Sequence, residues 1–144
     1  MEVSYNVIYG IMNHQGVIMK RLDLVKQIIA RKEQLNITIE NLAKLSGLGI
    51  RTVNRVLANE DVKLSTIESI TNFLGLDFAG NEIVSLDELK KQRAKEKAIF
   101  MASLVQSTSA LEIQGLDNDN INNIISMYEK EFLNGEYQNT LWVV

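Results

Sequence analysis

The chain has 144 residues, of which 46% are hydrophobic, 15 are lysine or arginine and 18 are aspartate or glutamate. This composition predicts a folded core in one domain, or in a small domain with an appended module. Cysteine is absent and no apolar run approaches the ~18 residues of a membrane span, which argues against disulfides, thiolate metal sites and membrane insertion. We therefore expect a cytoplasmic protein.

Residues 1–19 form a leader or arm whose order the sequence leaves open. The stretch VSYNVIYG alternates as a short strand does, but nothing nearby offers a pairing partner. His14, the only histidine, lies here, and we expect it to be solvated and without a role.

The net charge of −3 is distributed unevenly along the chain. Residues 20–63 hold nine basic and five acidic residues (+4), and residues 90–98 hold five and one (+4). Residues 64–89 and 99–144 each carry a net −5. Because attraction to DNA depends on charge within about one Debye length, ~8–10 Å, segment 20–63 is suited to a nucleic acid despite the acidic total. The acidic segments are then expected to face away from DNA or toward a basic protein.

Residues 20–35 have the periodicity of an amphipathic helix. Its expected apolar stripe consists of Leu22, Val25, Ile28, Ile29 and Leu35, with Lys20, Arg21, Lys26, Arg31 and Lys32 largely on the other faces.

The stretch TIENLAKLSGLGIRTVNRVL, residues 38–57, predicts two short helices joined by a tight turn. Thr38 is expected to cap the first helix and Gly49 to start the second. Ala43 allows two helix axes to approach closely, and Gly47 can adopt the positive φ that the turn requires. The spacing directs four side chains toward a shared interior: Leu42, Leu48, Val53 and Val56.

The same spacing leaves Gly49, Ile50, Arg51, Asn54 and Arg55 facing outward. Arginine and asparagine are suited to base edges and phosphates, so this face predicts a DNA-reading helix. The alternative is a helical hairpin that binds nothing. The agreement of the small, turn and apolar positions favours the DNA-binding interpretation.

The run LAKLSGLGIRTVNRVL resembles the helix-turn-helix of the lac repressor family, and VKLSTIESITNFLGL resembles the following helix of Cro-type XRE regulators. Both families have the lambda-repressor-like fold, and the resemblance covers roughly residues 20–76. It implies an all-α protein with a compact four- to five-helix DNA-binding domain at residues 20–80. A helical C-terminal segment, 85–144, for dimerisation or partner binding follows in our interpretation.

The resemblance also implies roles for individual residues. Ile50, Arg51, Asn54 and Arg55 would contact bases and Thr52 a phosphate, while Thr38 and Gly49 complete the candidate DNA-binding set. These families usually have Ser or Thr where this chain has Gly49, which puts one phosphate contact in doubt. On the reading helix, from about Gly49 to Ala58, we expect Arg51 or Arg55 to pair with guanine, Asn54 with adenine and Ile50 with a thymine methyl.

Capping boxes predict two further helix starts, Ser65 with Glu68 and Ser85 with Glu88. The first helix should end at Gly75 and bury Ile67, Ile70, Phe73 and Leu74. The second should run to about Gln106 with an apolar stripe of Leu86, Leu89, Ala98, Met101, Leu104 and Val105. Ser109 with Glu112 is expected to cap a short helix that ends near Gly115.

A last helix is expected to open at Asp117 or Asn118 and to end at Gly135. Its apolar face comprises Ile121, Ile124, Ile125, Tyr128 and Phe132. Helices this short bury little surface alone, and palindromic DNA favours a two-fold dimer, so we expect residues 86–144 to form a homodimer. Trp142 either covers the helix pair or anchors a partner protein, and we favour the first.

The basic run KKQRAKEK, residues 90–97, has two interpretations. It lies on phosphates beside the reading helix, or it is the solvated face of a helix, which is the commoner case and the one we favour.

Two functions fit these features: a sequence-specific, dimeric bacterial repressor that binds double-stranded DNA, and an antitoxin-like protein. In the second, the acidic C-terminal helices neutralise a partner protein while the helix-turn-helix autoregulates its operon. Catalysis is rejected because no phosphate loop, metal-ligand spacing or catalytic constellation is present. We expect no catalytic residues, no metal and no cofactor.

Overall fold

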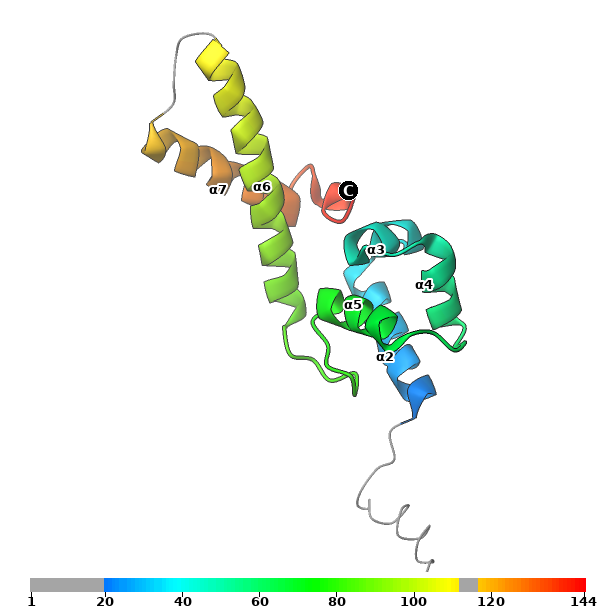
Figure 1. Ribbon diagram of the computed structural model, residues 1–144. Coiled ribbons are helices and arrows are strands. Elements are labelled where there is room, and N and C mark those ends of the chain that lie inside the picture. Colours follow the sequence, from blue (N-terminus) through cyan, green and yellow to red (C-terminus); the bar gives the residue numbers. More distant parts are fainter. Residues whose placement is uncertain (1–19, 112–116) are drawn as a thin grey trace, which may run out of the picture. The chain divides into compact units, whose positions relative to one another are not determined.

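The computed structural model describes residues 20–111 and 117–144, and its contacts divide the chain into two compact units, residues 1–83 and 84–144 (Figure 1). Over the described residues the regular elements are helices, which confirms the expected all-α class. The first unit contains α2 (Arg21–Leu35), α3 (Ile39–Ser46), α4 (Ile50–Leu57) and α5 (Leu64–Leu74). The second contains α6 (Leu86–Leu111), α7 (Asn118–Asn134) and the 3-10 helix η1 (Gln138–Thr140). The expectations for residues 1–19, including the strand and His14, lie outside the described residues.

In the first unit, α2 packs on α4 and α5, while α3 packs on α4 and α5. The apolar core draws on all four helices and on the ends of the connecting loops. It consists of Leu24, Val25, Ile28, Leu35, Ile37, Leu42, Ala43, Val53, Val56, Ile67, Ile70, Leu74 and Leu76. Burial of the Leu42, Ala43, Val53 and Val56 side chains agrees with the predicted interior, whereas Leu48 is only half-buried.

The buried stripe of α2 is rotated relative to the predicted one. Leu22 and Ile29 are exposed, whereas Leu24 is buried. The stripe runs through residues 24, 28, 31 and 35, which are three or four positions apart, so Ile29 lies beside it rather than in it.

The sequence predicts Arg31 on the polar side of α2, but Arg31 is only 4% exposed. Its Nε–H donates to the carbonyl oxygen of Leu74 at 2.9 Å, and its guanidinium pairs with the carboxylate of Glu82. Leu74 is the last residue of α5, where carbonyl groups lack partners within the helix. Arg31 is buried because it satisfies one of those carbonyls.

The ends of α3 and α5 follow the predicted chemistry. Thr38 caps α3, with its side-chain oxygen accepting from the Asn41 N–H at 3.1 Å. Gly47 and Gly75 end α3 and α5 at φ of 71° and 70°. The predicted Ser65 cap is wrong, because the N-cap of α5 is Lys63, two residues earlier, and the helix begins at Leu64. Phe73 is half-buried rather than buried.

In the second unit, α7 packs across α6 (Figure 1). The buried stripe of α6 contains three alanines, Ala94, Ala98 and Ala102, which recur every four residues and allow close helix packing. Ser85 caps α6, with its hydroxyl accepting from the Glu88 N–H at 3.1 Å. The predicted apolar stripe of this helix omits Ala94 and Ala102, which are buried. It includes Leu104, which is 49% exposed.

The expected helix break at Ser109 is absent, since α6 continues to Leu111; the remainder of that short helix, residues 112–116, lies outside the described residues. The α7 helix begins after Asp117, whose carboxylate accepts from the Asn120 N–H at 2.8 Å, and it ends before Gly135 as predicted. On its apolar face Phe132 is buried, whereas Ile121, Ile124, Ile125 and Tyr128 are half-buried.

Two cations of the basic run 90–97 hold the C-terminal tail, an arrangement that neither interpretation foresaw. Arg93 donates to the carbonyl oxygens of Leu141 and Val143, at 2.9 and 3.0 Å. Lys97 donates to the carbonyl oxygens of Thr140 and Val143, and its ammonium lies 5.2 Å from the centre of the Phe132 ring. Burial, followed by the charge of Arg93, lowers the pKa of Lys97. Exposed Lys91 and Lys95 retain the solvated-face interpretation.

Within residues 20–111 and 117–144, no helix has both the length and the apolar character needed to cross a membrane.

Candidate nucleic-acid interface

The α3–turn–α4 segment brings two short helices together around a glycine. Gly47 adopts φ of 71°, and the Leu48 N–H returns to the carbonyl oxygen of Ala43 at 2.8 Å. This turn aligns α4 so that Val53 and Val56, both fully buried, face the core. The opposite side of α4 is consequently presented to solvent.

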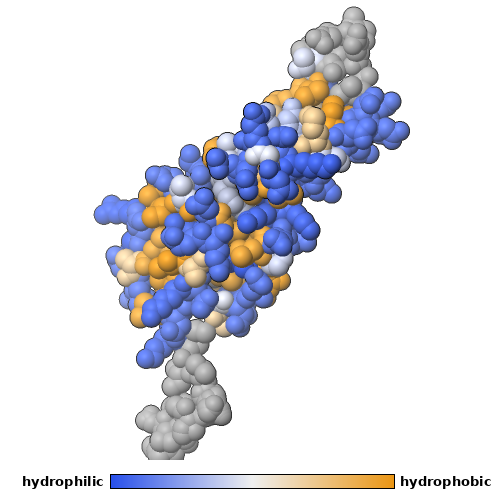
Figure 2. Space-filling model, turned by 180° about the vertical axis from the view of Figure 1, so that it is seen from behind, coloured by the Kyte–Doolittle hydropathy of each residue, from blue (hydrophilic) through white to orange (hydrophobic). Residues whose placement is uncertain are grey.

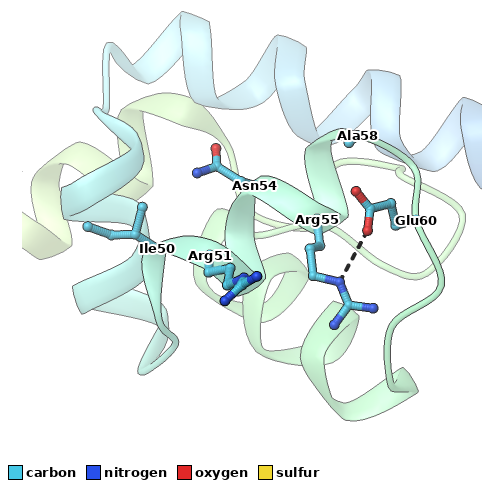
Figure 3. Close-up of a pocket in the computed structure, with 6 residues that line it drawn as sticks. All are labelled: Ile50, Arg51, Asn54, Arg55, Ala58 and Glu60. Atoms are coloured by element: carbon cyan, nitrogen blue, oxygen red, sulfur yellow. Dashed lines mark hydrogen bonds and ion pairs between the residues drawn. The ribbon is translucent and has the colours of Figure 1, made fainter.

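Four of the predicted DNA-contacting residues lie together on this solvent side. Ile50, Arg51, Asn54 and Arg55 are all exposed, and they line one surface hollow of about 1100 Å³ (Figure 3). They occupy positions i, i+1, i+4 and i+5, which share one face of a helix. The face therefore combines two guanidinium groups, one amide and one aliphatic side chain.

The other three predicted residues lie outside the lining of this hollow. Thr38 is exposed and its hydroxyl oxygen is engaged in capping α3. Gly49 precedes α4 as its N-cap without a side-chain hydrogen bond, and no heavy atom lies within 4 Å of the Cβ that a larger residue would carry there. Thr52 is half-buried.

Two residues of the hollow, Ala58 and Glu60, were not identified from the sequence. They follow α4, where the chain turns back through Asn59 at φ of 60°. The Asn59 N–H bonds to the carbonyl oxygen of Val56 and the Glu60 N–H to that of Arg55, each at 3.0 Å. This pair of bonds is the Schellman ending of a helix. Asparagine after a helical run is a signal for such an ending and could have indicated the return of Glu60.

Arg55 interacts with this returning segment. Its Nε–H donates to Glu60 Oε1 at 3.3 Å (dashed line in Figure 3), and Nη2 donates to the carbonyl oxygen of Asp61 at 2.8 Å. The two side chains are each about half exposed. The sequence had assigned Arg55 to DNA alone, without a protein partner.

A second arginine holds the same segment from the start of α2. Arg21 donates to the side-chain and main-chain oxygens of Asn59, at 3.0 and 3.1 Å, and pairs with the carboxylate of Asp61. The hydrogen bond from Arg21, and then its charge, holds the pKa of the Asp61 carboxyl below its usual value. Residues 59–61 are therefore bound between two guanidinium groups.

The side chains of this surface match the chemistry of a DNA duplex. Arginine forks match guanine O6 and N7, asparagine matches adenine N6 and N7, and an aliphatic side chain can contact a thymine methyl. Among the residues that the structure describes, no cluster of His, Asp and Glu could hold a metal ion.

Residues 28–81 match the family model described as helix-turn-helix, which covers the second half of α2, all of α3–α5 and part of the loop that follows. The chain has no match among the curated proteins or among the solved structures.

Proposed function

We propose that this chain binds a specific duplex sequence as a dimeric repressor. Residues 28–81 match the helix-turn-helix family, of the lambda-repressor-like Cro/C1 type, and this is the domain of a DNA-binding transcription regulator. The observation that carries the proposal is the gathering of Ile50, Arg51, Asn54 and Arg55 on the exposed side of α4. The α4 helix enters the major groove, where its exposed face contacts base edges. Thr38, Gly49 and Thr52 lie next to the sugar-phosphate backbone of the bound DNA.

The assignment of bases follows from donor geometry. Arg51 or Arg55 pairs with guanine, Asn54 with adenine, and Ile50 contacts a thymine methyl. The basic segment 20–63 supplies the attraction to phosphates, whose strength depends on salt.

Exposed apolar side chains of the second unit support a homodimer through residues 86–144. Ile99, Phe100, Leu104 and Met127 are 47–61% exposed. Figure 2 shows hydrophobic residues at the surface among hydrophilic ones. A second copy that covers them would remove apolar surface from water and would place two reading helices on a palindromic site.

Selection of bound duplexes from a random pool, with wild type and the double variant Arg51→Ala/Arg55→Ala in parallel, tests the reading helix. We expect a palindromic consensus that the variant fails to enrich. Recovery of no motif by folded wild type would sink the proposal and favour the antitoxin-like alternative, in which the second unit binds another protein.

Light scattering after size exclusion tests the dimer. Phe100→Glu should yield a monomer, since it places a charge in the covered surface. Leu64→Glu is the matched control, because Leu64 is 69% exposed but belongs to the first unit. A wild-type monomer at micromolar concentration, or equal effects of the two variants, would contradict dimerisation through residues 86–144.

A further inference from the structure

The end of α4 places one acidic side chain beside one basic side chain of the candidate reading face. Backbone bonds of the Schellman ending bring Glu60 back to the last turn of α4, through its N–H to the Arg55 carbonyl oxygen at 3.0 Å. The carboxylate then accepts from Arg55 Nε at 3.3 Å. Glu60 is thus coupled to Arg55 through both main chain and side chain.

Residues 59–61 are held in this position independently of Arg55. Arg21, from the start of α2, makes two hydrogen bonds to Asn59 and an ion pair to Asp61. Glu60 lies between these two anchored residues. The main chain of Glu60 therefore remains beside α4 whether or not Arg55 changes its rotamer, which keeps the Glu60 side chain within reach of Arg55.

The hydrogen bonds of Arg55 use part of its donor set and leave the rest available. A guanidinium has five N–H groups, and those used are Nε–H and one on Nη2. Both hydrogens of Nη1 and one of Nη2 remain. Two protein acceptors thus hold the group as a fork with a fixed plane, which is what bidentate pairing to a base requires.

The charge of Glu60 separates the two kinds of DNA contact that Arg55 could make. A phosphate near Arg55 would meet the Glu60 carboxylate, and the two like charges repel. The O6 and N7 acceptors of guanine carry no formal charge, so the same carboxylate opposes them far less. Arg51 has no ion pair within the described part of the chain, so its charge remains available to a phosphate.

From these contacts we infer that Glu60 is a specificity-determining residue, which positions Arg55 to read a base and discourages it from binding phosphate, while Arg51 supplies the salt-dependent affinity. The inference rests on the proposed function. It assigns different roles to two arginines that the sequence pattern treats alike.

The test compares Glu60→Gln with wild type on the selected consensus duplex and on a scrambled duplex of equal length, across a salt series. Glutamine keeps the side-chain shape and an acceptor but removes the charge. We expect affinity for the scrambled duplex to rise about 5- to 10-fold while affinity for the consensus changes less than 2-fold, which lowers the specificity ratio. The slope of log K against log salt on the scrambled duplex should steepen by about 0.9, the value for one added phosphate contact.

Two comparisons separate this effect from general electrostatics. Glu68→Gln, on an exposed position of α5, makes the same charge change away from Arg55 and should tighten both duplexes equally and weakly. In an Arg55→Ala background, Glu60→Gln should no longer change the specificity ratio. Arg51→Ala should reduce the salt slope on both duplexes, whereas Arg55→Ala should weaken only the consensus complex.

Three results would overturn the inference. Equal effects of Glu60→Gln and Glu68→Gln would show that Glu60 acts on DNA binding only through the net charge of the domain. If Glu60→Gln weakened both complexes equally and lowered the melting temperature of the protein, Glu60 would serve only to stabilise the fold. Failure of wild type to enrich any duplex would remove the proposed function itself, and that result is recognised before any Glu60 variant is measured.

Discussion

The Nε–H of Arg93 donates a 2.9 Å hydrogen bond to the carbonyl oxygen of Leu141, 48 residues further along the chain. A second bond from the same guanidinium reaches the carbonyl oxygen of Val143 at 3.0 Å. The Arg93 side chain is only 16% exposed, so its charge is largely withdrawn from solvent. A residue of the basic run 90–97, which the sequence predicts to be a solvated face, therefore holds the tail that carries Trp142.

Arg93→Ala should release this tail and destabilise the second unit. A hydrogen bond to a charged group contributes about 1.5–3 kcal/mol, and solvent weakens the exposed bond to Val143, so we expect a loss of about 2–4 kcal/mol in the free energy of unfolding. Trp142, buried at 7% exposure, should then emit at longer wavelength. Fluorescence-monitored denaturation measures both quantities. Lys95→Ala, at an exposed position of the same helix, is the control, and equal emission maxima in the two variants would argue against this role of Arg93.

Glu82→Ala should destabilise the first unit more than an ordinary surface ion pair would. The variant removes a carboxylate from Arg31, whose side chain is 5% exposed, although Glu82 itself is 52% exposed. Because solvent screens Glu82, we expect about 1–3 kcal/mol in the free energy of unfolding, below the range for a fully buried pair. Glu33→Ala, which breaks the 3.6 Å pair between the exposed Glu33 carboxylate and Lys32, should cost less than about 1 kcal/mol. Urea denaturation compares the two, and equal costs would contradict the prediction.

Gly80→Ala should cost more stability than Gly47→Ala, although both glycines have a positive φ. At Gly47 nothing lies within 4 Å of an added Cβ, so the cost is left-handed strain alone, about 1–2 kcal/mol. At Gly80 the Cβ would lie 2.8 Å from Cγ and 2.9 Å from Cβ of Gln27, which adds about 1–3 kcal/mol of overpacking. Thermal unfolding of the two variants gives the order, and the reverse order would show that the backbone of residues 77–82 yields easily.

Arg21→Gln should raise the pKa of Asp61 toward its usual value. The pKa of Asp61 is lowered in the folded chain, so ionised Asp61 stabilises the fold above its unfolded pKa of about 3.9, and this contribution is lost as pH falls through the lower folded pKa. The variant should therefore lose this acid-sensitive contribution. Carboxyl NMR titration measures the shift directly.

Asp77 provides an internal control in the same titration. Its pKa is lowered chiefly by the hydrogen bond from the Asn81 backbone N–H, at 2.8 Å, with no part played by Arg21. Asp77 should titrate identically in wild type and Arg21→Gln. An unchanged Asp61 in the variant, or a parallel change in Asp77, would contradict the assignment of the Asp61 shift to Arg21.

Features that depend only on neighbouring residues could be predicted from the amino-acid sequence. Thr38 caps α3 and Gly47 ends it because capping and positive φ are decided within one helical turn. The same locality explains why Ile50, Arg51, Asn54 and Arg55 could be assigned to one exposed face from their spacing. The prediction that Ser65 caps α5 is wrong, because a helix can begin after Lys63 as well as after Ser65. Local sequence signals fix helix boundaries only to within one or two residues.

Which charged side chains bind groups inside the protein depends on contacts between residues far apart in the chain. Arg31 was assigned to solvent because its charge suits the polar side of α2, yet the end of α5, 43 residues away, supplies a carbonyl that needs a donor. Arg93 differs in the same way, since its acceptor lies 48 residues along the chain. Arg55 and Glu60 are close in sequence, but their pairing required the left-handed turn at Asn59. A guanidinium can satisfy either solvent or a distant carbonyl, and helix periodicity carries no information about which acceptor the folded chain brings within reach.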